Sequence, residues 1–363
     1  MKKGFSLLVN TLLLLLLFSC NDENTRTVVT INGDNFLVNG KPTYAGRVWQ
    51  GYPIEGLLLN SRMVQGIFDD ENPETAKRWV YPDDSLWSAE RNTAEFVAAM
   101  DEWSAYGLNS FTLNLQGGSP MGYGNKNWKN TAFDEKGNLK PAYLTRLSSI
   151  LDKADELKMV VILGYFYFGQ DQFLKDEEAV INATRNATQW LLENNYRNVI
   201  VEVNNECDIK AYDHDILKED RIHELIILVK DIEVDGQRLL VGTSYSGGFV
   251  PLSNVVEVSD FLLIHGNAVE EPEGITTMIE QTKALDSYAG IPIIFNEDDH
   301  YAFDQDDNNF VRSVTAHVSW GFFDFRRDGE SFEDGFQSVP VDWHVSTPRK
   351  KAFFEKVKEI ALD

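Results

Sequence analysis

Short apolar runs alternate with amphipathic helical stretches along most of this chain, and this alternation constrains the fold more than any other feature of the sequence. It indicates a parallel sheet whose strands are joined by helical crossovers. The expected strands lie at 44–47, 109–115, 159–163, 198–203, 239–243, 261–264, 292–295 and 320–324. The expected helices lie at 92–107, 141–154, 180–191, 215–235, 273–286 and 307–318, with a last one from residue 348. These repeating units predict an α/β fold of the (β/α)8 or TIM-barrel type, and a doubly wound open sheet is the alternative.

Three segments depart from the regular alternation. The turn signals Asn32-Gly33-Asp34 and Asn39-Gly40-Lys41 predict a short β-hairpin within residues 28–44, ahead of the barrel. Residues 48–91 form a long connection between the first expected strand and its helix. In a barrel such an insertion lies on the C-terminal face, where active sites sit. The crossover at 245–258 contains glycine and proline, and we expect it to lack a full helix.

The first twenty residues have the pattern of an export signal. Met1-Lys2-Lys3 is positively charged, and Leu7 to Phe18 is a mostly apolar run, shorter than the ~20 residues of a membrane-spanning helix. The run ends in Ser19-Cys20, which resembles the lipobox of bacterial lipoproteins. The resemblance implies a signal peptide over residues 1–19, cleavage before Cys20 and lipid attachment to its thiol. The alternative is an ordinary signal peptide followed by an unmodified cysteine.

The same resemblance implies a location in the bacterial cell envelope, anchored by lipid, at the surface or periplasmic face of the outer membrane. Residues 20–27 would then be a linker, and 28–363 is expected to be one domain because no low-complexity segment divides it. The acidic stretch Asn21 to Asn24 is similar to the surface-export signal of Bacteroidetes lipoproteins, and a solvated linker is the alternative. The only other cysteine is Cys207, so a lipidated Cys20 leaves no intramolecular disulfide.

The charge of the chain restricts its partners. Lys and Arg total 33 and Asp and Glu total 57, which gives a net charge of −24. A field of that sign repels a phosphate backbone, so nucleic acid is excluded as an expected partner. Polyanionic polymers are disfavoured for the same reason, unless a local cationic pocket receives them.

Two glutamates follow strand-like runs in similar settings. Glu206 ends the run that begins at Val199, and Glu297 ends the run that begins at Ile291; each comes directly after an asparagine. In a barrel, both would point into the mouth formed by the carboxyl ends of the strands. Glycosidic cleavage needs such a pair, one carboxyl protonated to serve the leaving oxygen and the other ionised. The alternative is that both are solvated turn residues.

This arrangement resembles the glycoside hydrolases of clan A, the retaining (β/α)8 enzymes that include the family-five cellulases. The resemblance rests on Asn205-Glu206 after the fourth expected strand and on Glu297 after the seventh. It implies that Glu206 is the general acid/base, that Glu297 is the nucleophile, and that Asn205 hydrogen-bonds the 2-hydroxyl of the sugar being cleaved. The group often has proline after the acid/base, whereas Cys207 follows here.

Other residues fall where a sugar-binding site needs polar or aromatic groups. Arg47 ends the first expected strand and can orient the Glu297 carboxylate, with a structural salt bridge as the alternative. His265 follows the sixth expected strand, where a neutral imidazole can hydrogen-bond a sugar hydroxyl or the nucleophile. Trp320 can stack on the apolar face of a sugar, with core packing as the alternative. The remaining candidates are Asn114, Tyr165, Tyr245 and His300.

The acidic residues beside Glu297 also raise the question of a metal. Asp298-Asp299-His300 fits no EF-hand loop, and no histidine pair has zinc spacing, so we expect neither a metal nor another cofactor. The expected partner is a carbohydrate, a β-linked glycan or oligosaccharide, that the chain hydrolyses by double displacement. The competing hypothesis is a surface glycan-binding lipoprotein without catalysis on the same scaffold.

Overall fold

The computed structural model describes residues 26–124 and 127–363. The predicted signal peptide, Cys20 with its predicted lipid, and most of the predicted linker therefore lie outside the described residues. Within the described residues, no helix is both long and apolar enough to cross a membrane.

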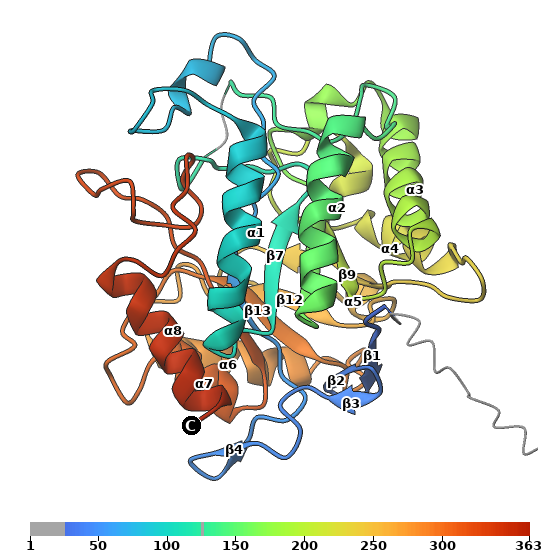
Figure 1. The fold of residues 1–363 in the computed structure, drawn as a ribbon. Helices are drawn as coiled ribbons and strands as arrows, with labels where there is room; N and C mark the ends of the chain where they lie inside the picture. Colours follow the sequence, from blue (N-terminus) through green and yellow to red (C-terminus); the bar gives the residue numbers. More distant parts are fainter. Residues whose placement is uncertain (1–25, 125–126) are drawn as a thin grey trace, which may run out of the picture.

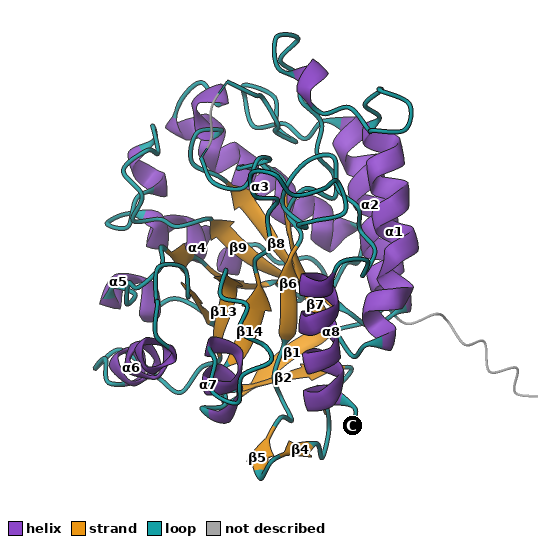
Figure 2. Cartoon of the chain, turned by 90° about the vertical axis from the view of Figure 1, so that its left-hand side faces the viewer, coloured by secondary structure: helices purple, strands orange, loops and turns teal. Residues whose placement is uncertain are grey.

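The centre of the molecule is a parallel sheet rolled into a barrel (Figure 2). The order of its strands is β10-β9-β8-β7-β6-β14-β13-β12-β11, and every neighbouring pair is parallel. Their bounds are β6 Leu59–Arg62, β7 Ser110–Asn114, β8 Val160–Phe166, β9 Val199–Asn204, β10 Leu240–Gly242, β11 Ser244–Tyr245, β12 Leu262–His265, β13 Ile293–Asp298 and β14 Ser319–Phe322. The TIM-like barrel predicted from the sequence is confirmed.

The barrel closes through the strand pair β10 and β11. Only Thr243 separates them in the chain, yet β10 pairs with β9 while β11 pairs with β12. One extended segment, 240–245, thus joins the two edges of the sheet and leaves no long free edge. The segment after it carries only the four-residue helix α5 (Ser253–Val256), which confirms that this crossover lacks a full helix.

Helices surround the barrel and bury its outer face (Figures 1 and 2). Besides α5 they are α1 Ala89–Ala105, α2 Pro141–Glu156, α3 Glu177–Glu193, α4 Ile222–Asp231, α6 Pro272–Lys283, α7 Asn309–Thr315 and α8 Pro348–Ala361. Helix α1 begins three residues earlier than Asn92 because the Ser88 hydroxyl accepts the Arg91 amide and caps it. Asn92 instead donates its buried amide to the carbonyls of Gln65 and Gly66, which ties this helix to the loop after β6.

The N-terminal segment closes the base of the barrel. Strands β1 (Val29–Asn32) and β2 (Asn35–Val38) form the expected hairpin, and β3 (Lys41–Pro42) extends it. Val29 and Phe36 of this hairpin join the apolar cluster that fills the lower barrel. The other members of that cluster are Leu58, Val160, Ile162, Ile200, Phe261, Leu263 and Ile294. Figure 1 shows the hairpin at one end and the long loops at the other.

The predicted position of the first barrel strand is wrong. Residues 44–47 form a turn, with positive φ at Tyr44 and Gly46 and a hydrogen bond from the Arg47 amide to the Tyr44 carbonyl. Positive φ is incompatible with an extended strand. The strand is β6, fifteen residues further on, and the intervening β4 (Val48–Trp49) and β5 (Tyr52–Pro53) form a hairpin at the base (Figure 1).

The long connection after the first strand therefore spans residues 63–88 rather than 48–91. It lies at the carboxyl ends of the strands, as predicted, but Trp49 does not belong to it. The Trp49 indole instead donates to Glu359 of α8 at the base. Within the connection, the Asp70 carboxylate accepts hydrogen bonds from Thr75 and from the Trp79 indole. Besides these hydrogen bonds, the connection contains one short 3-10 helix, Ala76–Arg78, and no α-helix.

Candidate active site

The two strand-end glutamates meet at the mouth of the barrel. Glu206 follows β9, and Glu297 is the fifth residue of β13. One oxygen of each carboxylate and one ring nitrogen of His265 all lie within 4.8 Å of one another. His265 ends β12, the neighbour of β13, and its Nδ1 is 2.9 Å from Glu206 Oε1 and 3.7 Å from Glu297 Oε2. The barrel thus brings together residues that are far apart in the chain.

Glu297 is held on both oxygens. The Nε of Arg62 forms an ion pair with its Oε2 at 2.7 Å, and the Asn267 amide donates to its Oε1 at 2.7 Å. Arg62 is fully buried at the end of β6. Asn267 is brought near by Gly266, where a Cβ would lie 2.2 Å from a carboxylate oxygen of Asp298. Only glycine permits this approach of two strand ends.

Glu206 sits in a different environment. Its backbone has φ +54°, in the left-handed region, and its amide donates to the Ser244 hydroxyl. Such a conformation in a residue other than glycine is sparsely populated and often marks a functional site. Its side chain is 12% exposed, so one edge faces the solvent in the barrel mouth. The nearby Asp208, fixed by hydrogen bonds from Ser246, adds negative charge.

The two carboxyls differ in the groups that shift their pKa values. Burial raises the pKa of Glu206 to about 7, against the lowering effect of Arg62, and the charge of Asp208 raises it further. Burial also raises the pKa of Glu297, but Arg62 and His265 both oppose that rise. Glu297 has a direct cation and an amide donor, both of which favour its ionised form, whereas Glu206 has neither. Burial lowers the pKa of His265, which is therefore neutral.

A buried polar network lies under the pair. Arg62 donates from Nη2 to the Asn205 side-chain oxygen at 2.7 Å, and its Nη1 lies 4.0 Å from a Glu202 oxygen. Asn296 donates to the other Glu202 oxygen. The Asn205 side-chain nitrogen is buried and has no hydrogen-bond partner among the described residues. An unpaired buried donor beside two carboxyls is suited to a ligand hydroxyl.

Four of the predicted site residues are thus together: Asn205, Glu206, His265 and Glu297. Asn114 is buried inside the barrel against Gly164, and neither its side-chain oxygen nor its nitrogen has a partner within residues 26–124 and 127–363. His300 comes three residues after Glu297 in the chain, and its Nδ1 is 2.6 Å from Asp298 Oδ1. That contact raises the pKa of His300.

Two predicted positions face the helices instead of the barrel mouth. Tyr165 is fully buried against α3, with its hydroxyl 3.1 Å from that of Thr188. Tyr245 is buried as well, and its hydroxyl accepts the Leu252 amide. Each side chain leaves its strand on the outer face of the barrel, so neither is placed to bind a ligand at the mouth.

Trp320 and Arg47, which were predicted to contribute to the site, lie away from the carboxyl pair. Trp320 is fully buried, stacked on Phe310 of α7 at 4.7 Å and packed against Phe353 of α8, so it belongs to the core rather than to a stacking surface. Arg47 donates to the carbonyls of Glu359 and Ile360 in α8 and does not reach Glu297. Its alternative interpretation, a structural contact, is the one the geometry supports.

Arg62, Asn267 and Tyr167 are the neighbours of the pair that the sequence did not reveal. Arg62 follows only three consecutive leucines, 57–59, which is too short a run to stand out as a strand. The Tyr167 hydroxyl lies 2.9 Å from that of Ser119, and the charges of Glu297 and Arg62 both act on its pKa, which burial raises. The sequence feature that could have indicated Arg62 is its position shortly after an apolar run, with the polar residues Asn60 and Ser61 between the leucines and the arginine.

The acidic residues beside Glu297 are occupied by protein partners. One Asp298 oxygen accepts from the Trp320 indole and the Asn309 amide, and the other faces His300. Glu206, His265 and Glu297 present oxygen and nitrogen atoms at a spacing that could hold a cation. The guanidinium of Arg62, at 2.7 Å from Glu297, already supplies positive charge there.

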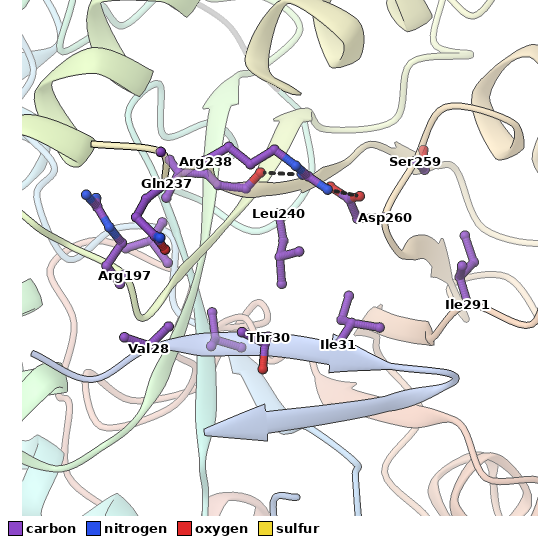
Figure 3. A pocket seen from close by; sticks show the side chains of 14 residues that line it. Val28, Thr30, Ile31, Arg197, Gln237, Arg238, Leu240, Ser259, Asp260 and Ile291 are labelled. Atoms are coloured by element: carbon purple, nitrogen blue, oxygen red, sulfur yellow. Dashed lines mark hydrogen bonds and ion pairs between the residues drawn. The ribbon is translucent and has the colours of Figure 1, made fainter. Parts of the chain in front are cut away.

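A cavity of about 470 Å³ lies at the opposite end of the barrel (Figure 3). Its walls come from β1 and from the beginnings of barrel strands, including Leu240 of β10. Figure 3 shows Arg238 and Asp260 paired on one wall. The Nη1 and Nη2 atoms of Arg238 donate to the two carboxylate oxygens at 2.7 and 2.9 Å. The beginnings of the strands are the stabilising face of a barrel, so this cavity is separate from the paired carboxyls.

No family model matches the chain, and no curated protein sequence matches it. Solved structures match it over most of its length. An endo-1,4-β-mannanase from Rhizomucor miehei is 13% identical, with a TM-score of 0.59, and the match covers 92% of this chain and 99% of the mannanase. A protein of Bacteroides vulgatus ATCC 8482, provisionally assigned as a glycoside hydrolase, is 13% identical with a TM-score of 0.56 over 91% of this chain.

A family 5 glycoside hydrolase from the same Bacteroides is 14% identical, with a TM-score of 0.51 over 87% of this chain. The chain spans 60% and 66% of the length of these two Bacteroides proteins. At such identities the likeness concerns the fold. The chain is a (β/α)8 barrel structurally similar to family 5 and related clan A glycoside hydrolases, and it carries two carboxyls at the mouth of that barrel.

Proposed function

We propose that this protein is a retaining glycoside hydrolase that cleaves a β-linked glycan or oligosaccharide, with Glu297 as nucleophile and Glu206 as general acid/base. The observation that carries the proposal is the pair itself, with carboxylate oxygens within 4.8 Å of each other in unlike environments. Retaining enzymes hold their carboxyl groups ~5–5.5 Å apart, whereas inverting enzymes leave ~6.5–9.5 Å for a water molecule. The short separation favours retention.

The proposed reaction follows from the protonation of the pair. Glu206 donates its proton to the glycosidic oxygen while the Glu297 carboxylate attacks the anomeric carbon, so the glycosidic bond breaks and a glycosyl ester forms. Glu206, now ionised, takes a proton from water, which attacks the same carbon and releases Glu297. In this reaction the Asn205 side-chain nitrogen, which lacks a hydrogen-bond partner within the described residues, would donate to a sugar hydroxyl. Arg62 and Asn267 keep Glu297 ionised and oriented.

The substrate class is supported by charge and by structural likeness. The net charge of −24 disfavours polyanionic glycans. The structurally similar proteins include an endo-1,4-β-mannanase, so neutral β-mannans and β-glucans come first in a screen.

A product screen tests the proposal. Wild-type protein, Glu297→Gln and the control Glu280→Gln, which changes an exposed glutamate of α6, are incubated with neutral and acidic β-glycans. Reducing ends, product size and the anomeric configuration of the first product are followed. We expect wild type and the control to release sugar with retained configuration, and Glu297→Gln to release none.

Other results point elsewhere. Inverted product would overturn the nucleophilic role of Glu297. Binding of a glycan without release of product by any of the three proteins would refute the hydrolase and favour the non-catalytic glycan-binding lipoprotein.

We also propose that the protein is lipid-anchored in the bacterial envelope through Cys20. The support is the Ser19-Cys20 sequence after an apolar run, together with the position of Arg26 and Thr27. Arg26 and Thr27 bond to Asp152 and Asp155 near the end of α2, at the base of the barrel. An anchor there would leave the mouth facing away from the lipid. Loss of palmitate labelling and of membrane association in Cys20→Ala would support the anchor, and unchanged fractionation would refute it.

A further inference from the structure

An exposed tyrosine stands beside the carboxyl pair, outside the residues considered so far. Tyr123 lies in the loop between β7 and α2, and 55% of its surface is exposed. Its hydroxyl donates to Asp299 Oδ2 at 2.8 Å, and Asp299 comes two residues after Glu297. The charge of Glu297 contributes to the raised pKa of Tyr123, which burial of its hydroxyl end mainly causes. The ring is therefore neutral and lies on the Glu297 side of the mouth.

Two phenylalanines pack against the Tyr123 ring. Phe323 and Phe325, which follow β14, meet Tyr123 edge to face, with ring centroids at 5.5 and 5.0 Å. Gly122 makes the close approach possible, because its φ is +103° and a Cβ there would lie 2.6 Å from the Phe325 ring. The hydroxyl bond and the two ring contacts fix an exposed aromatic side chain, so little conformational entropy remains to be lost when a ligand covers it.

A fixed, exposed aromatic ring is suited to one kind of ligand here. The C–H face of a pyranose is apolar, and covering both surfaces removes them from water. The Asp299 carboxylate, which accepts the Tyr123 hydroxyl, places negative charge directly beside the ring and disfavours a sugar acid at this place. A neutral sugar ring satisfies both conditions.

We propose that Tyr123 forms a stacking subsite for a neutral sugar ring on the glycone side, next to the ring that Glu297 attacks. The proposal rests on the proposed function. In double displacement the ring that becomes bound to Glu297 is the glycone, and the leaving group lies by Glu206. Tyr123 is tied to the end of β13, the strand of Glu297, so it serves the sugar that continues the glycone. The protein would then recognise at least two sugars before the cleaved bond.

Aryl glycosides of different length test the subsite. Wild type, Tyr123→Ala and Tyr123→Phe are assayed with 4-nitrophenyl β-glucoside and β-cellobioside and with the corresponding β-mannoside and β-mannobioside. Tyr52→Ala is the matched control, because Tyr52 is 43% exposed on the hairpin at the base. Binding of cellohexaose and mannohexaose to Glu297→Gln, with and without Tyr123→Ala, is measured by calorimetry, and thermal unfolding confirms that each variant folds.

The expected result is selective. Tyr123→Ala lowers kcat/KM for the disaccharide glycoside roughly three- to tenfold, mainly through KM, and leaves the monosaccharide glycoside within about twofold. Tyr123→Phe keeps most of the activity, and Tyr52→Ala changes neither substrate. In Glu297→Gln, removal of the Tyr123 ring weakens hexasaccharide binding by a similar factor.

The failures are distinguishable. Hydrolysis by wild type with an unchanged disaccharide-to-monosaccharide ratio in Tyr123→Ala overturns the subsite and leaves the hydrolase intact. Equal losses on both substrates also overturn it, because they indicate a general disturbance of the site. If wild type neither hydrolyses any glycoside nor binds either hexasaccharide, the proposed function and the subsite are both refuted.

Discussion

The raised pKa of Glu206 has a consequence for stability that can be measured without knowing the substrate. Its pKa is about 7 in the folded protein, against an ordinary value of 4.5. A carboxyl whose pKa is raised on folding stabilises the native state below its unfolded pKa, and that stabilisation is lost as the pH rises through the folded pKa. The contribution is about 3 kcal/mol between pH 4.5 and pH 8.5, from about 1.4 kcal/mol for each pH unit that separates the two pKa values.

Glu206→Gln isolates this effect, because glutamine has nearly the same shape and no charge at any pH. We expect the variant and wild type to differ little in free energy of unfolding at pH 4.5. At pH 8.5 the variant should be more stable by about 3 kcal/mol, since wild type must then bury a charge. Urea unfolding at both pH values, with linear extrapolation, gives the comparison.

The control is Glu280→Gln on the exposed face of α6, where burial is absent and no such pH-dependent difference is expected. A Glu206→Gln effect that is the same at both pH values would refute the assignment of the proton to Glu206. That assignment would also be refuted if wild type were more stable than Glu206→Gln at pH 8.5.

The remaining predictions concern activity and packing. On the substrate found in the screen, kcat/KM should fall about tenfold per pH unit above roughly pH 7, as Glu206 loses its proton; a flat profile from pH 6 to 9 would contradict the acid role. Arg62→Met should lower the free energy of unfolding by about 3–5 kcal/mol and abolish most activity, because Glu297 would remain buried without its cation; urea unfolding and initial rates test both effects. Asn267→Ala should lower kcat by roughly 10- to 100-fold with little change in KM, since it removes a hydrogen bond to a charged oxygen, and a change confined to KM would argue against that role. Trp320→Ala should cost about 3–5 kcal/mol of stability while the folded fraction keeps its kcat/KM, whereas a selective loss of glycan binding would restore Trp320 to the site.

The pattern of the sequence was sufficient for the architecture and for the two glutamates. Period-two and period-3.6 runs follow from local backbone geometry, so the barrel and the strand-end positions of Glu206 and Glu297 could be predicted from them. His265 could be predicted on the same basis, because it directly follows an apolar run, whereas Asn205 was predicted from the resemblance to clan A glycoside hydrolases. The apolar run Leu57-Leu58-Leu59 is short, and for that reason the first barrel strand was predicted at 44–47 instead of at β6.

The face on which a side chain leaves its strand was decided by the tertiary structure. Tyr165 lies in β8 and Trp320 in β14, but the side chain of each leaves its strand on the face toward the helices. A shift of one residue exchanges the inner and outer faces of a strand, and no local pattern marks it in a strand buried on both sides.

The order of the residues along the chain, therefore, determined the barrel, the two carboxyls and the distance of each from a strand end. The tertiary structure determined the chemistry of those carboxyls, because the pairing of β6, the first barrel strand, with β14, the last, places Arg62 at 2.7 Å from Glu297. A pKa depends on burial and on charges within a few ångströms. Those neighbours, Arg62 and Asn267 at Glu297 and His265 at Glu206, come from parts of the chain that are distant in sequence, so the difference in environment on which the proposed roles rest exists only in the folded protein.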